Sequence, residues 1–128
     1  MDSVILIYFL DHVGTLQARA AKRLAALRSA GDQIVISDLV RMECRVIPIR
    51  MGDSARLAHF DSFFAHPDVQ AVPITTAVFD RATRIRATHG YKAIDSINLA
   101  AAAEGHCGLF LTNDTKLSRF PDLTVETI

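Results

Sequence analysis

The chain has 128 residues, half of them apolar, and its 14 Lys and Arg side chains balance 14 Asp and Glu side chains. This size and apolar content predict one domain, residues 1–128, whose core needs neither disulfides nor a structural metal. The zero net charge weighs mildly against a protein that coats nucleic acid indiscriminately, so any contact with phosphates must come from local arginine patches.

The first part of the chain begins with an apolar run, which is followed by a predicted helix and then by a predicted buried strand. That run, residues 4–10, is too short to span a bilayer and lacks the basic flank and cleavage site of a signal peptide. Residues 15–29 are rich in Ala, Leu, Arg and Lys and are followed by Gly31, so they predict a helix. The β-branched run 33–36 predicts a strand.

The next segment predicts two helices. Ser37 or Asp38 is expected to cap the first helix, which Pro48 should end. Asp53 opens an amphipathic helix that Pro67 stops. The helical spacing of the three Phe side chains in that helix favours packing in a core or an interface over stacking on bases.

Strands continue to alternate with helices in the rest of the chain. The expected elements are a strand 69–74, a helix from Thr75 or Thr76 to His89, an Ala-rich helix from 94–96 to Gly105, a strand 108–112, a loop or helical turn 113–120 and a strand 123–127. This alternation predicts an α/β fold with a parallel sheet covered on both faces. The functional residues are then expected at the carboxyl ends of the strands.

The cysteines provide no sign of a metal or redox site. Cys44 and Cys107 match no zinc or redox spacing, so we expect two free thiols in a reducing cytosol. With no membrane-spanning segment, the sequence predicts a soluble protein of the cytoplasm.

Four acidic residues occupy positions that such a sheet would bring together. Asp2 precedes the first apolar segment, Glu43 lies about one turn into the second helix, and Asp95 begins the Ala-rich helix. Asp114 directly follows the strand at 109–112. Each has an ordinary structural alternative, since Asp95 could cap its helix, Asp114 could be a turn residue, and the other two could be solvated.

The surroundings of the acids favour a chemical role for the group. Asp2, Glu43 and Asp95 stand in markedly apolar stretches, and buried carboxylates that cluster repel one another and lose hydration. Either protons or a divalent cation would relieve this repulsion. Oxygen ligands without His or Cys favour Mg²⁺ or Mn²⁺, which can activate water and neutralise a phosphodiester. The group therefore indicates phosphodiester hydrolysis.

Four blocks of the sequence resemble the PIN-domain nucleases, and most closely the VapC-type toxins of bacterial toxin–antitoxin pairs. The blocks are residues 2–8 (Asp-Ser-Val-Ile-Leu-Ile-Tyr), 37–43 (Ser-Asp-Leu-Val-Arg-Met-Glu), 95–100 (Asp-Ser-Ile-Asn-Leu-Ala) and 111–114 (Leu-Thr-Asn-Asp). Any one block is weakly specific, but together they cover essentially the whole chain in the family's order.

The resemblance implies a PIN-like three-layer α/β/α fold and a metal-dependent endoribonuclease. It makes Asp2, Glu43, Asp95 and Asp114 the catalytic acids. Asp2 and Asp95 would ligate Mg²⁺ (or Mn²⁺) directly, Glu43 would serve as ligand or base, and Asp114 would bind a second ion or position water. It also implies a homodimer, an RNA substrate and a cognate antitoxin protein.

The polar neighbours of the acids are candidates for orienting them. Ser3, Thr112 and Asn113 can hydrogen-bond to ligating carboxylates, although ordinary turn and cap roles explain them equally well. Asn98 stands where relatives often carry His, on the helix face of Asp95.

The opening of the sequence departs from the family's pattern. Relatives usually have a few residues before the first Asp, and these form the first strand, whereas here the sequence starts at Met1. The first strand is therefore expected to be short or truncated. Either the true start lies upstream, or the sheet tolerates a clipped strand beside the active site.

Among the basic residues, Arg41 and Arg45 are the candidates for gripping RNA, because they share a helix with Glu43. Two alternatives come from other functional classes. A catalytically silent PIN-like module for dimerisation or partner binding is the first. The second, a phosphoacceptor domain, ranks lower because Asp2-Ser3-Val4 lacks a second Asp and Lys116 stands in the wrong context for a receiver.

Overall fold

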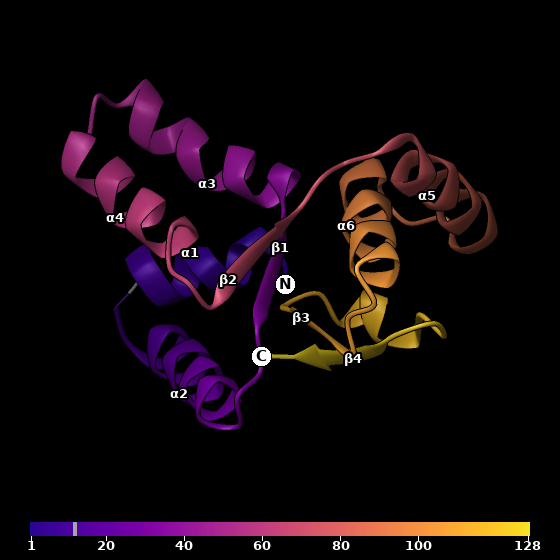
Figure 1. The fold of residues 1–128 in the computed structure, drawn as a ribbon, viewed down its shortest axis with the longest axis horizontal. Coiled ribbons are helices and arrows are strands. Elements are labelled where there is room, and N and C mark those ends of the chain that lie inside the picture. Colours follow the sequence, from indigo (N-terminus) through magenta and orange to yellow (C-terminus); the bar gives the residue numbers. More distant parts are fainter. Residues whose placement is uncertain (12) are drawn as a thin grey trace.

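The computed structural model describes residues 1–11 and 13–128. In chain order the elements are α1 (Ser3–Asp11), α2 (Thr15–Ser29), β1 (Ile34–Ser37), α3 (Asp38–Arg50), α4 (Ser54–Phe64), β2 (Val69–Val72), α5 (Thr76–His89), α6 (Ala93–Glu104), β3 (Leu109–Thr112), the 3₁₀ helix η1 (Thr115–Arg119) and β4 (Thr124–Thr127) (Figure 1). No helix in the described ranges is long and apolar enough to cross a membrane.

The helices begin at the residues that the capping pattern predicts. The hydroxyl of Ser37 accepts a hydrogen bond from an amide of the first turn of α3, Asp53 does the same for α4, and Thr75 does so for α5. The prediction that Pro48 ends α3 is wrong, because this helix continues to Arg50. Pro48 lies in the last turn and lacks the N–H that would bond to the carbonyl four residues earlier, but its ring is buried inside the protein.

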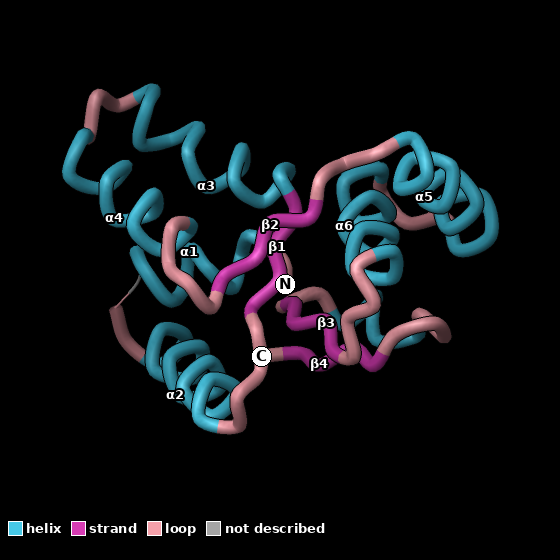
Figure 2. Tube along the Cα trace, in the orientation of Figure 1, coloured by secondary structure: helices cyan, strands magenta, loops and turns pink. Residues whose placement is uncertain are grey.

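All strand pairs are parallel, as the alternation predicts, but the sheet is split into two halves. β1 pairs with β2, and β3 pairs with β4. Figure 2 shows these two ribbons of strand with the amino terminus between β1 and β3. We call the space between β1 and β3 the seam.

Helices cover both faces of the two half-sheets, which confirms the three-layer arrangement (Figure 1). Side chains along β3 alternate, because successive residues of a strand point to opposite faces. Leu111 joins the core formed with α1, α2, α3 and α4, whereas Phe110 joins the core formed with α5 and α6. Phe60 and Phe63 are buried in the first of these cores, as their spacing predicts.

The first two residues lie at the seam and bond to both half-sheets. The amino group of Met1 donates a hydrogen bond to the Val35 carbonyl on β1, with an N···O distance of 3.2 Å. The next amide, that of Asp2, donates to the Leu111 carbonyl on β3 at 2.9 Å. Two consecutive residues thus form one backbone hydrogen bond to each half-sheet, and α1 begins directly after them.

Candidate active site

An open pocket of about 760 Å³ lies at the carboxyl end of the seam. Asp2, Asp95 and Asp114 all line this pocket, which we call the acid pocket. They come from three places in the fold: the entry to α1, the first turn of α6 and the segment after β3. The carboxyl ends of parallel strands and the amino ends of the following helices share one edge of a sheet, which explains why these acids converge.

Glu43 does not line the acid pocket but lies next to its acids. It is on α3, its carboxylate accepts a hydrogen bond from Ser3, and it is close enough to Asp2 and Asp95 to sense their charges. Its Oε2 atom is buried and has no hydrogen-bond partner among the residues that the structure describes. A buried carboxylate oxygen without a partner is costly unless a proton or a cation reaches it.

The neighbouring acids perturb the ionisation of Glu43 and Asp95. Burial raises the pKa of Glu43, the Ser3 hydroxyl opposes that rise, and the charges of Asp2 and Asp95 add to it. Burial likewise raises the pKa of Asp95, and the charges of Asp2 and Asp114 raise it further. The four acids are therefore electrostatically one group, as expected for carboxylates that share a small volume.

Thr112 ties two of the acids together. Its buried hydroxyl donates to Oδ2 of Asp2 at 3.0 Å and accepts a hydrogen bond from the Asp114 amide at 3.1 Å. One side chain at the end of β3 thus fixes both the carboxylate before α1 and the turn after the strand. Asp114 also caps η1 through the Lys116 amide, at 2.9 Å, so its turn role is real.

Asn98 and Asn113 bond to neighbours of the acids rather than to the acids themselves. Asn98 accepts a hydrogen bond from Ser37 at 2.7 Å, which links the cap of α3 to the middle of α6 across the seam. Asn113 donates to the Ile128 carbonyl at 2.8 Å and holds the end of the chain. Asp95 is not a helix cap, because Lys92 occupies that position and its side chain makes no capping bond.

The family model of the PIN domain matches residues 1–123. The chain belongs to the PIN domain family. Two solved structures share the fold of this PIN domain at low sequence identity. One is VapBC2 from Rickettsia felis bound to a DNA fragment from their promoter, with a TM-score of 0.77, 16% identity, and coverage of 98% of this chain and 94% of that chain.

The second similar structure is a toxin–antitoxin complex from Klebsiella pneumoniae. It has a TM-score of 0.73 and 23% identity, and the match covers 98% of this chain and 93% of that chain. At these identities the likeness establishes the fold alone. No curated protein matches the sequence.

The two arginines proposed for RNA binding lie outside the acid pocket of this PIN domain. Arg41 pairs with Asp38 at 3.5 Å, and Arg45 pairs with Asp61 at 3.0 Å. Both arginines line a separate groove along α3. The contact of Arg41 and Arg45 with RNA stays a prediction. Their ion pairs with Asp38 and Asp61 neutralise part of the positive charge that would attract RNA.

Two lysines lie close enough to Asp95 to act on its carboxyl group. Lys92 lines the acid pocket, and the charges of Lys92 and Lys116 both lower the pKa of Asp95 against the larger effects that raise it. A sequence signal for Lys92 existed, because it stands three residues before Asp95 at the start of the same helix. The position of Lys116 near Asp95 depends on the turn after β3, so the sequence alone did not indicate it.

The donor chemistry of the site fits a hard divalent cation. No three His, Cys, Asp or Glu side chains within 1–11 and 13–128 are arranged so that they could hold a metal ion by themselves. Mg²⁺ does not need such a cage, because it binds through one or two carboxylates, several waters and substrate phosphates. Asp2 and Asp95 offer those carboxylates, and the unpartnered Oε2 of Glu43 offers a third oxygen nearby.

Proposed function

We propose that this PIN domain is an endoribonuclease that uses Mg²⁺ or Mn²⁺, and that it is the toxin of a VapBC-type toxin–antitoxin pair in the cytoplasm. The observation that carries the proposal is the meeting of four mutually repelling acids, from four separate segments, at the carboxyl end of the seam. The fold shared with two toxin–antitoxin complexes supports the biological setting. RNA as substrate rests on the resemblance to VapC-type toxins.

Each acid has a proposed part in the reaction. Asp2 and Asp95 hold the cation, Glu43 assists as a further ligand or as a base, and Asp114 positions water or a second ion. A cation bound there would activate water and offset the charge that develops on the phosphodiester. The Thr112 hydroxyl and the Ser3 hydroxyl keep the carboxylates of Asp2 and Glu43 in place.

The lysines supply the proposed contact with the substrate. Lys92 and Lys116 stand beside Asp95, so a phosphate that approaches the acids also approaches two positive charges. Their attraction is local, which agrees with a chain whose net charge is zero. The open shape of the acid pocket suits a polymer backbone, which must enter and leave from the side.

An exposed apolar stripe on α3 is the proposed docking surface of the antitoxin. Met42, Val46 and Ile49 follow one another at helical spacing and are 53%, 40% and 58% exposed. They line a groove of about 370 Å³ together with Arg41 and Arg45. A contiguous apolar stripe with charged borders is typical of a surface that receives an amphipathic helix.

We also propose that the protein forms a homodimer. Light scattering with and without the antitoxin tests this oligomeric state.

The test of the function is cleavage of a mixed pool of transfer, ribosomal and messenger RNA by the purified protein. Reactions contain Mg²⁺, Mn²⁺ or EDTA. We expect discrete products that require the metal and disappear in EDTA. Folded, metal-loaded and antitoxin-free protein that cleaves nothing would support the alternative, a catalytically silent binding module. The absence of a three-ligand group in the described residues is the observation that favours this alternative.

A further inference from the structure

One wall of the acid pocket is apolar. Ile94 directly precedes Asp95 in the first turn of α6, Val4 lies in the first turn of α1, and both line the pocket beside the acids. We call these two side chains the apolar wall. Ile94 is 43% exposed and belongs to neither of the two cores that the described residues form. An isoleucine that joins no core adds little to the stability of the fold, so its apolar surface is available to a ligand.

The position of Ile94 sets it apart from the other exposed large apolar residues in the described part of the chain. Most of these lie on α3 or directly after it, where Met42, Val46 and Ile49 form the stripe proposed for the antitoxin. Among the described residues of this kind, Ile94 alone lines the acid pocket. Single exposed apolar residues are common on protein surfaces. This one, however, stands next to a carboxylate in the pocket where cleavage is proposed.

The charges of the pocket indicate which ligand the apolar wall receives. Lys92 and Lys116 lie close enough to Asp95 to lower its pKa, so they attract a phosphate to the same place. A nucleotide of single-stranded RNA presents a charged phosphate and, beside it, a flat base with apolar faces. The lysines therefore suit the phosphate, and the apolar wall suits the base.

A protein segment fits the apolar wall less well than a base does. An amphipathic helix is held by a row of apolar anchors at helical spacing, as the stripe on α3 provides. The acid pocket offers two branched apolar side chains, and the rest of its lining is acidic, basic, polar or a single alanine. An apolar surface of two side chains matches the face of one base.

We propose that Ile94 and Val4 form a subsite for one unpaired base of the RNA beside the scissile phosphate, and that Ile94 sets the base preference there. The inference rests on the proposed function, because the acids and the lysines hold the phosphate. Bases inside a duplex stay stacked on their neighbours, so only an unpaired base turns a face to Ile94. A purine covers more of the apolar wall than a pyrimidine does and is therefore preferred.

The first experiment detects the base without requiring cleavage. The isoleucine methyl groups of the full chain are labelled with ¹³C, and their NMR signals are followed in Ca²⁺ while a short adenine RNA is added. We expect the Ile94 signal to shift, because the ring current of a stacked base acts on the methyl group that it covers. An abasic oligomer of equal length and charge should leave the signal in place.

The internal control of this experiment is Ile47, which is 46% exposed on α3 and does not line the acid pocket. Its signal should stay unchanged with both oligomers. An Ile94 signal that adenine RNA does not move, or that the abasic oligomer moves equally, would overturn the base subsite. The first of these results is also the one expected if the apolar wall receives a protein instead.

The second experiment measures the base preference at the cut. The parent protein, Ile94→Ala, Ile94→Leu and the matched control Ile47→Ala act with Mg²⁺ on unstructured RNA of random sequence, and the product ends are sequenced. We expect the parent and the control to prefer a purine at one position beside the cut. Ile94→Ala should lose this preference and raise KM roughly fivefold with a much smaller change in kcat, and Ile94→Leu should restore both.

The outcomes separate the subsite from the nuclease. Cleavage by Ile94→Ala with the preference and KM of the parent would overturn the subsite and leave the nuclease standing. If no protein cuts RNA, but adenine RNA and not the abasic oligomer shifts the Ile94 signal, the nuclease fails and the base subsite stands.

Discussion

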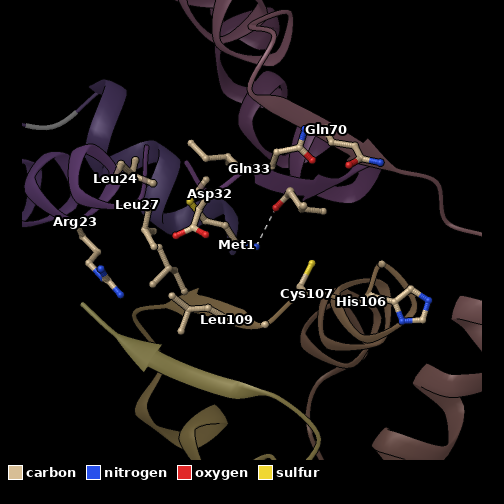
Figure 3. A pocket seen from close by; sticks show the side chains of 15 residues that line it. Met1, Arg23, Leu24, Leu27, Asp32, Gln33, Gln70, His106, Cys107 and Leu109 are labelled. Carbon is tan, nitrogen blue, oxygen red and sulfur yellow. Dashed lines mark hydrogen bonds between the residues drawn. The ribbon is translucent and has the colours of Figure 1, made fainter. Parts of the chain in front are cut away.

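The two ends of the seam differ in how they are closed. At the carboxyl end, polar bonds cross the seam: Asp2 bonds to β3 and Thr112, and Ser37 bonds to Asn98. At the amino end, β1 and β3 border an open groove of about 540 Å³, into which Met1 reaches to bond to the Val35 carbonyl (Figure 3). The difference teaches that the acid pocket is positioned by a few specific side-chain bonds and not by a continuous sheet beneath it.

The seam also divides the acids. Glu43 is on α3, which follows β1, whereas Asp95 is on α6 and Asp114 follows β3. Asp2 lies at the seam and bonds to β3. Neither half carries the site alone, so whatever holds the halves together also sets the distances between the acids. Each prediction below removes one element of the closed end and compares it with an equivalent element elsewhere.

The largest effect is expected from Asp95→Asn. The change removes one anionic ligand without adding bulk, so cleavage should fall by about 100-fold or more while the fold is retained. Initial rates with Mg²⁺ and a circular dichroism spectrum measure the two quantities. Glu104→Gln is the matched control, because Glu104 lies on the same helix but pairs with Arg81 at 3.0 Å. Full metal-dependent activity in Asp95→Asn would remove Asp95 from the site.

A smaller loss is expected from Thr112→Val, which keeps the shape of the side chain but removes the hydroxyl between Asp2 and Asp114. Loss of a group that orients a ligand typically lowers metal affinity or activity roughly 10- to 100-fold. Thr83→Val is the control, since the Thr83 hydroxyl bonds to a backbone carbonyl of its own helix. If the two variants bind Mn²⁺ equally well, Thr112 does not position the acids.

The hydrogen bond between Ser37 and Asn98 should appear as a difference in the free energy of unfolding between two helix-cap variants. Ser37→Ala and Thr75→Ala each remove a helix cap, at a cost of about 1 kcal/mol. Ser37→Ala also leaves the buried Asn98 oxygen without its donor, which adds about 1–3 kcal/mol. Urea unfolding measures the difference. Equal free energies of unfolding for the two variants would show that the bond across the seam contributes nothing.

The smallest effect concerns pH in the metal-free protein. A carboxyl whose pKa is raised by folding stabilises the fold most when protonated, and this contribution is lost as the pH rises through the raised pKa. Asp95→Asn stays neutral at every pH. Its Tm should therefore rise relative to the parent protein between about pH 4 and pH 7. A difference in Tm that does not change with pH would argue against crowding of the acids.

Much of the fold could be predicted because its signals are local. Helix caps at Ser37, Asp53 and Thr75 and the alternation of strands with helices depend on neighbouring residues only. The acids could be placed at one edge because that edge follows from parallel strands in general.

The rest could not be predicted because it depends on contacts between distant residues. The end of α3 beyond Pro48 reflects tertiary burial of the ring, which no local pattern reports. The ion pair of Arg45 with Asp61 joins α3 to α4, and the bond of Ser37 to Asn98 joins the end of β1 to α6. The sequence predicted a short first strand but not two separate half-sheets. The strands with which β1 and β3 pair are set by the whole fold, which local sequence does not report.

The most direct test of the account is Mn²⁺ binding to the metal-free protein, measured by electron paramagnetic resonance. Asp2→Asn removes the acid at the seam, Asp95→Asn removes the acid on α6, and Glu104→Gln is the control. If the acid pocket is one site that spans the seam, both variants should lose at least about tenfold in affinity while the control binds as the parent does. Unchanged binding in either Asp2→Asn or Asp95→Asn would contradict a single site to which both acids contribute.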